Sequence, residues 1–130
     1  MITTRLVGVV LVKKGWVVQS INFRKYLPIG RPGIAINYLD RWGIDELVLL
    51  DIERTGEKDP SWHEFISESV KQCNTPVAVG GGISSVEDAV RCIRYGADKI
   101  VINSAFLVNP KLVGEISQVL GRQAVVVSLD

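Results

Sequence analysis

Gly43-Ile-Asp-Glu-Leu-Val-Leu-Leu-Asp51 and Gly96-Ala-Asp-Lys-Ile-Val-Ile-Asn103 follow the same order of residue types. Each begins with a glycine of the kind that ends a helix, continues with an aspartate and a second charged residue, and becomes an apolar strand that ends on a polar residue. Repetition of one helix-to-strand unit favours a (βα)8 barrel over a doubly wound open sheet. No Gly-x-Gly-x-x-Gly follows the first apolar run, which also disfavours a dinucleotide-binding fold.

The rest of the chain alternates between apolar runs and helical patterns. The runs predict five strands, over residues 5–12, 46–51, 76–79, 99–103 and 124–129. Helical spacing predicts helices over residues 33–42, 59–73, 84–95 and 109–120, the third with a capping box of Ser84 and Glu87. Residues 22–32, which contain Pro28, Gly30 and Pro32, are predicted to form a long loop.

Strands that alternate with helices predict right-handed βαβ units and a parallel sheet. The chain has room for about four such units and a fifth strand, so we expect a single α/β domain over residues 1–130. A parallel sheet needs neighbours on both edges, whereas the last run ends on Asp130. The expected fold is therefore a parallel (βα)8 TIM-type barrel that is partial here, truncated after strand five.

Composition excludes several classes of function. The chain is 47% hydrophobic and 22% charged, with a net charge of +1, which is typical of a globular protein. Since no stretch concentrates Lys and Arg, no nucleic-acid or membrane surface is expected. Cys73 and Cys92 are interpreted as buried free thiols of a cytoplasmic protein, and no signal peptide or transmembrane segment is expected. With His63 as the only histidine, we expect no metal site and no cofactor.

Chemistry in such barrels gathers at the carboxyl ends of the strands. Gly80-Gly81-Gly82 ends one strand and precedes a helix, and Asn103-Ser104 ends the next. Backbone N–H groups of glycines and of a helix start can approach an anion closely, which favours phosphate as the ligand. The alternative is a tight strand-to-helix turn that needs glycine for its dihedral angles.

Two carboxylates follow strands at the same end. Asp51 and Asp130 can act as general acid or base if the barrel mouth partly desolvates them. For Asp51 an orienting hydrogen bond to a neighbouring loop is an equally good interpretation. For Asp130 the catalytic interpretation is favoured, because a charge directly after an apolar strand has little structural reason.

Three charged residues stand near the starts of strands, at the opposite mouth. Arg5, Glu46 and Lys99 occupy equivalent positions and alternate in sign. Each can simply be a solvated end of its strand. Together they can instead form a salt-bridged plug across the barrel axis, which suits a gated passage for a small polar molecule.

Several motifs in order make the chain resemble a known family. They are Asp45-Glu-Leu-Val-Leu-Leu-Asp-Ile52, Val79-Gly-Gly-Gly-Ile83, Gly96-Ala-Asp-Lys99, Ile102-Asn-Ser104, Asn109-Pro110 and Gln123-Ala-Val-Val-Val127. The chain looks like the cyclase subunit of imidazole glycerol phosphate synthase, a phosphate-binding barrel that works with a glutamine amidotransferase in histidine biosynthesis. The similarity covers all 130 residues, roughly the amino-terminal half of the family barrel.

The resemblance implies roles for individual residues. It implies phosphate binding by Gly81, Gly82, Asn103 and Ser104, catalysis by Asp130, an ammonia gate of Arg5, Glu46 and Lys99, a contact to the amidotransferase partner by Asp98, and a mobile loop over the active site at residues 22–32. The implied protein is a heterodimer with that partner and acts on a phosphorylated small molecule.

One position departs from the family pattern. The second catalytic aspartate belongs near the end of the first strand, where this chain has Leu11. Loss of one partner of an acid–base pair costs about 10²–10⁴-fold in rate. Glu53, close to Asp51, is a candidate that could partly fill the gap.

Three hypotheses follow from this pattern. The first is a cyclase-lyase that uses glutamine-derived ammonia to form imidazole glycerol phosphate and AICAR. The second is a cyclase-inactive paralogue that channels ammonia to another enzyme, as in surface-sugar amidation. The third is a fragment without activity of its own, whose unpaired sheet edges predict self-association.

Overall fold

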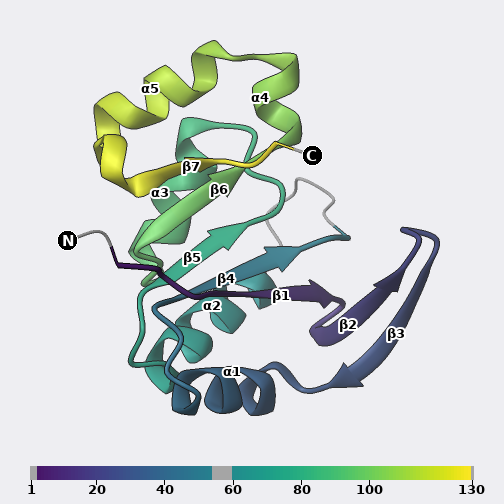
Figure 1. Cartoon of the computed structure of the whole chain (residues 1–130). Helices are drawn as coiled ribbons and strands as arrows, with labels where there is room; N and C mark the ends of the chain where they lie inside the picture. Colours follow the sequence, from purple (N-terminus) through teal and green to yellow (C-terminus); the bar gives the residue numbers. More distant parts are fainter. Residues whose placement is uncertain (1–2, 54–59, 130) are drawn as a thin grey trace.

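The computed structural model describes residues 3–53 and 60–129. Within them a seven-stranded sheet has the order β3-β2-β1-β4-β5-β6-β7, and it does not close on itself (Figure 1). The strands are β1 (Val7–Lys13), β2 (Trp16–Ile21), β3 (Lys25–Gly30), β4 (Glu46–Asp51), β5 (Val77–Gly80), β6 (Lys99–Ile102) and β7 (Val125–Val127). The helices are α1 (Pro32–Arg41), α2 (Pro60–Gln72), α3 (Val86–Arg94), α4 (Ser104–Val108), α5 (Lys111–Leu120) and the 3-10 turn η1 (Arg122–Ala124).

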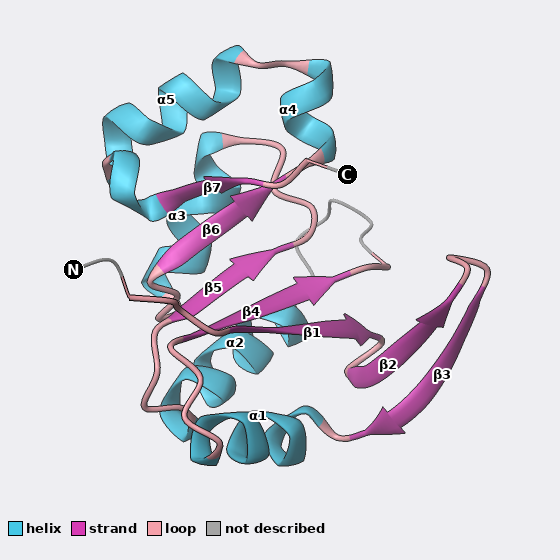
Figure 2. Ribbon diagram, viewed as in Figure 1, coloured by secondary structure: helices cyan, strands magenta, loops and turns pink. Residues whose placement is uncertain are grey.

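Strands β1, β4, β5, β6 and β7 are parallel and follow one another in chain order. Helices connect them from β1 onward, as Figure 2 shows. This is the order expected of consecutive βα units in a barrel. The prediction of a partial parallel barrel is confirmed.

The main core lies between one face of the sheet and the helices. Alternate residues of the strands point into it, because side chains alternate across a strand. The strand residues in this cluster are Val10, Val12, Leu47, Leu49, Val77, Val79, Ile100 and Ile102, and they pack with Ile36, Ile66, Ala89, Cys92, Leu112 and Ile116 of the helices. The intervening residues therefore lie on the other face, where Val9 of β1 is 57% exposed.

The repeated sequence unit adopts the same conformation twice. After α1 and after α3, Gly43 and Gly96 have φ values of +81° and +112°. The next residue in each copy then donates its N–H back into the helix, Ile44 to Leu39 O and Ala97 to Cys92 O. This bonding, with a buried apolar residue after the glycine, is the Schellman form of helix ending. The sequence prediction of a glycine stop at both places is confirmed.

The prediction of a long loop at residues 22–32 is wrong. The segment contains β3, which pairs antiparallel with β2 and has Val18 opposite Pro28. Pro28 indicated a loop, but a proline is tolerated in the outermost strand of a sheet, where its missing N–H needs no partner. The hairpin turns at Asn22 and Phe23, both with positive φ, and Arg24 N donates to Ile21 O.

Three further boundaries differ from the predictions. The helix cap is Ser85, whose side chain accepts from Asp88 N, instead of the predicted Ser84–Glu87 box. A short helix, α4, precedes α5, and β7 has three residues where six were expected. Asp59 and Asp130 lie outside the described residues. None of the described helices is long and apolar enough to cross a membrane.

Candidate functional site

The carboxyl ends of β1, β4, β5 and β6 surround a cavity of about 780 Å³. Leu11, Asp51, Gly81, Gly82, Asn103 and Ser104 all line this cavity. Phe23 and Tyr26 of the β2–β3 hairpin also line it. The topology thus brings together most of the residues that the sequence singled out at this end of the sheet.

Two of the three glycines are required by close packing. A Cβ on Gly80 would lie 2.7 Å from Leu50 Cδ2, and one on Gly81 would overlap the backbone of Asp51. Gly81 and Gly82 also have positive φ values of +107° and +74°. These contacts support the turn interpretation for Gly80 and Gly81, while their loop still faces the cavity with its backbone.

Ser84 and Asp88, at the start of α3, are hydrogen-bonded to side chains of the same segment. Ser84 donates both its N–H and its hydroxyl to Asp88 Oδ2, at 3.1 and 3.3 Å. Asp88 N in turn donates to Ser85 Oγ at 3.1 Å. An anion in the cavity would therefore find its donors at Gly81, Gly82 and the Asn103–Ser104 segment instead of at Ser84.

The floor of the cavity is apolar where the family resemblance implies an acid. Leu11 lies in register beside Leu50 of β4, and both line the cavity together with Val101. An aliphatic side chain neither gives nor takes a proton. Among the described residues that line the cavity, Asp51 is the one carboxylate.

Asp51 and Glu53, the two candidate acids within the described residues, differ in their surroundings. Asp51 Oδ1 accepts the N–H of Glu53 at 3.1 Å, which supports an orienting role for Asp51 in its own loop. Glu53 forms an ion pair with Lys14 of the β1–β2 turn at 3.6 Å. Glu53 therefore faces the hairpin base, and Asp51 is the better placed of the two for chemistry in the cavity.

A cluster of ion pairs lies at the opposite end of the same strands. Glu46 is only 8% exposed. Its Oε2 lies 3.4 Å from a terminal nitrogen of Arg5, and its Oε1 lies 3.2 Å from Lys99 Nζ. A buried carboxylate needs such partners, because an unpaired charge there would lose its hydration without compensation. The three strand-start charges thus form one connected cluster.

Comparison with known proteins identifies the family. Residues 5–130 match the family described as histidine biosynthesis protein. The chain belongs to this family. It is 40% identical over all 130 residues to the imidazole glycerol phosphate synthase subunit HisF of Exiguobacterium sibiricum, and 39% identical to the HisF subunit of Methanocaldococcus jannaschii.

The match covers the whole of this chain but only part of its relatives. It spans 52% of the Exiguobacterium subunit and 48% of the Methanocaldococcus subunit. The chain therefore spans about half the length of the curated relatives it matches. This agrees with a described sheet that does not close into a barrel.

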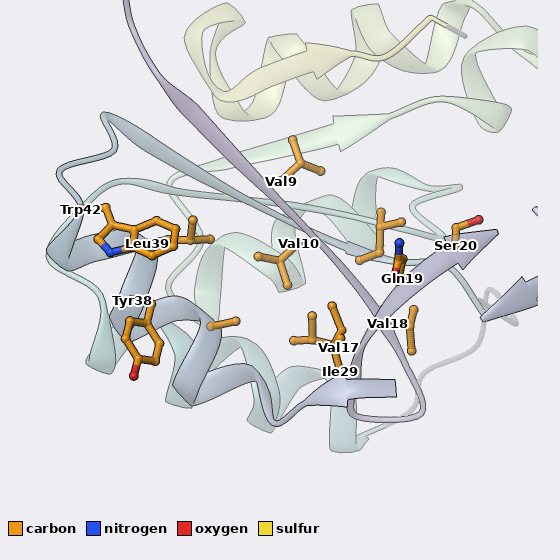
Figure 3. Close-up of a pocket in the computed structure, with 12 residues that line it drawn as sticks. Val9, Val10, Val17, Val18, Gln19, Ser20, Ile29, Tyr38, Leu39 and Trp42 are labelled. Atoms are coloured by element: carbon orange, nitrogen blue, oxygen red, sulfur yellow. The ribbon is translucent and has the colours of Figure 1, made fainter. Parts of the chain in front are cut away.

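This histidine biosynthesis family member has a second cavity, of about 670 Å³, beside β1 (Figure 3). Tyr38 and Leu39 of α1 and Trp42, which follows the helix, line one side of it, and Val17 and Ile29 of the hairpin line another. The sequence does not predict this cavity, since its residues come from separate apolar patterns. The described residues of its lining include no carboxylate, imidazole or amine, so they offer a packing surface instead of acid–base chemistry.

The remaining reactive side chains of this family member lie outside both cavities. Burial, with a smaller contribution from Asp88, raises the pKa of the Cys92 thiol to about 11, so Cys92 is protonated at neutral pH. Within residues 3–53 and 60–129, no three His, Cys, Asp or Glu side chains form a group that could hold a metal ion. Asp98, implied as a partner contact, is exposed and accepts the N–H of Val77 at 2.8 Å.

Proposed function

We propose that this chain forms the gate and one phosphate site of a cyclase subunit of the imidazole glycerol phosphate synthase type. The observation that carries the proposal is the arrangement of two polar sites at opposite ends of one parallel sheet. Glu46 joins Arg5 and Lys99 at the amino end, and the glycine loop and Asn103–Ser104 line a cavity at the carboxyl end. Membership of the histidine biosynthesis family supports the same role.

In the proposed activity, ammonia released from glutamine by an amidotransferase partner enters at the charged cluster. The sheet face between the two ends carries Val48, Ala78 and Val101. An apolar lining lets neutral ammonia pass while it keeps ammonium in solvent, because a charge pays a large desolvation cost there. Ammonia then reacts at the cavity with the ribulosyl aminoimidazole carboxamide phosphate substrate, which is split into imidazole glycerol phosphate and AICAR with loss of water.

The residues of the cavity have separate tasks in this proposal. Backbone N–H groups of Gly81 and Gly82, with Asn103 and Ser104, hold a substrate phosphate. Asp51 supports a general acid or base that Asp130 supplies. The site resembles phosphate sites of other barrels, which lie at this same end of the strands.

A second candidate function rests on Leu11. Its side chain lines the cavity at the place where the resemblance implies a catalytic aspartate. A protein with an intact ammonia gate and a disabled acid–base pair could activate the amidotransferase and pass ammonia to another enzyme. Surface-sugar amidation is one process with this requirement.

The test measures ammonia-dependent cyclisation of the ribulosyl aminoimidazole carboxamide phosphate substrate by the intact protein. Leu11→Asp is assayed beside it, and Leu50→Asp serves as the control, because Leu50 lines the same cavity on the neighbouring strand. Turnover by the unaltered protein supports the cyclase. Activity that appears only in Leu11→Asp, with a rise of about 10²–10⁴-fold, supports the conduit.

The two functions also differ in their effect on the partner. The conduit predicts stimulation of glutamine hydrolysis without cyclisation by the unaltered protein. Absence of any complex with a glutamine amidotransferase would exclude the conduit. Cyclisation by Leu50→Asp as strong as by Leu11→Asp would show that the position of the added carboxylate does not matter.

A further inference from the structure

The structure contains two identical aspartate contacts next to the charged cluster. Asp45 N donates to Leu6 O at 2.8 Å, and Asp45 Oδ2 accepts Leu6 N–H at 2.6 Å. Asp98 N donates to Val77 O at 2.8 Å, and Asp98 Oδ2 accepts Val77 N–H at 2.8 Å. Each aspartate thus makes two hydrogen bonds to the residue at the start of the neighbouring strand. Its backbone N–H donates one, and its side-chain oxygen accepts the other.

Each contact lies directly beside a member of the ion-pair cluster. Asp45 precedes Glu46, and the Leu6 that it holds follows Arg5, so one contact fixes both partners of the Arg5–Glu46 pair. Asp98 likewise precedes Lys99. Between the two contacts, Leu47 N donates to Pro76 O at 2.9 Å and ties β4 to β5. The three charged residues therefore lie on one continuous row of strand starts that hydrogen bonds join to one another.

This row matters because one of the two ion pairs, Glu46–Lys99, spans a whole strand. Glu46 of β4 and Lys99 of β6 reach each other past β5, where Ala78 presents only a methyl group on that face. Ala78 is 1% exposed, and the side chain of Glu46 is 10% exposed while that of Lys99 is 31% exposed. A small shift between strands would lengthen both pairs and leave the buried Glu46 carboxylate poorly compensated.

We propose that Asp45 and Asp98 are positioning residues that set the register of the strand starts and so hold Arg5 and Lys99 against Glu46. The ammonia-gate role of the cluster rests on the proposed function, but the positioning role does not. Asp98 then acts through its carboxylate oxygen as an acceptor for Val77, within the chain. A contact to a partner would instead depend on the negative charge of Asp98.

The test compares Asp98→Asn with Asp98→Ala. Asparagine keeps a side-chain oxygen that can accept the Val77 N–H but removes the charge, whereas alanine removes both. The coupling between Glu46 and Lys99 is measured by a double-mutant cycle with Glu46→Gln and Lys99→Met, from the unfolding constants of the chain in each background. In the unaltered chain we expect a coupling of about threefold or more.

The positioning role predicts that the coupling is kept within about twofold in Asp98→Asn and is lost in Asp98→Ala. The control is Asp88→Ala, which removes the carboxylate that accepts the Ser84 N–H at the far end of the sheet. This variant should leave the coupling unchanged. Equal coupling in Asp98→Ala and the unaltered chain would overturn the proposal. So would an equal loss in Asp98→Asn and Asp98→Ala, which would mean that the charge is what matters.

A second measurement needs no unfolding. Amide hydrogen exchange followed by NMR should quicken at Val77 in Asp98→Ala and at Leu6 in Asp45→Ala, each without effect at the other site. If Asp98→Ala does not fold, Asp98→Leu replaces it, since this variant keeps the bulk of an exposed side chain and removes the acceptor. Unchanged exchange at Val77 would contradict the proposal. All of these readouts use the chain alone, so a failed cyclisation assay and a failed positioning role give different results.

Discussion

Asp40 joins the end of α1 to the segment before β5. Its Oδ1 accepts the hydroxyl of Thr75 at 2.7 Å and the N–H of Thr75 at 3.2 Å, and its Oδ2 accepts from Asn74 at 3.2 Å. The Thr75 hydroxyl is the largest of the causes that lower the pKa of this carboxyl below its usual 3.8, and partial burial opposes them. The contact is therefore a property of the ionised carboxylate.

The lowered pKa predicts a pH-dependent contribution to stability. A carboxyl whose folded-state pKa lies below its unfolded value stabilises the fold above about pH 4, and this contribution disappears as the pH falls through the folded-state pKa. We expect Asp40→Asn to lower the thermal midpoint at pH 7 and to lower it less at pH 3. The measurement is thermal unfolding at both pH values, and an equal shift at both would contradict the assignment.

For single residues, the sequence predicts the end of the sheet at which a side chain lies better than the residue that it contacts. Gly81, Asn103 and Asp51 were expected at one end of the sheet, and the structure places them around one cavity. The contacts of Glu53 with Lys14, and of Asp98 with Val77, were not foreseen. Such contacts depend on which strands become neighbours and in what register, and these are fixed only when the whole sheet assembles.

At the scale of elements, the turn after β5 gives a sharp test of the glycine loop. Gly81→Ala would force its Cβ onto the backbone of Asp51 at a residue with φ of +107°. We expect a loss of at least about 2 kcal/mol in the free energy of unfolding. Gly114→Ala in α5 is the control, because a Cβ there meets open space, and it should gain about 0.5–1 kcal/mol. Denaturant unfolding of both variants checks the prediction.

The same scale shows where sequence reasoning failed. The strands of the repeated units were predicted from their own residues, because an apolar run between turn signals is a local pattern. Residues 25–30 were not, because Pro28 and Gly30 are loop signals and the strand forms only by pairing with β2. Pairing of this kind overrides local propensity. The shifted cap at Ser85 has a similar cause, since Ser84 and Ser85 are both good cap residues.

At the scale of the whole molecule, the open sheet predicts self-association of the isolated chain. β7 ends the described sheet on one side, and β1 is paired with β2 only at Val12 and Lys13. Apolar side chains are exposed beside β1, where Val9 is 57% exposed and Trp42 is 73% exposed. Open edges and apolar surface together favour association of copies.

Sedimentation at micromolar concentrations should therefore give species larger than the monomer. We expect Val9→Lys to shift the distribution toward the monomer, because a charge on the exposed edge opposes pairing. Val119→Lys on α5 is the matched control, since Val119 is 59% exposed on an outer helix. A single monomeric species of the unaltered chain would contradict the prediction.

The duplicated unit has a consequence for how such a sheet can arise. Its two copies share a helix ending, a buried residue and an aspartate contact, but one presents Glu46 and the other Lys99 to the same spot, 3.2 Å apart. Two identical copies would bring like charges together over a buried methyl group and repel each other. The difference between the two copies at this one position therefore turns a charge repulsion into an ion pair, so the site depends on the repeat being inexact.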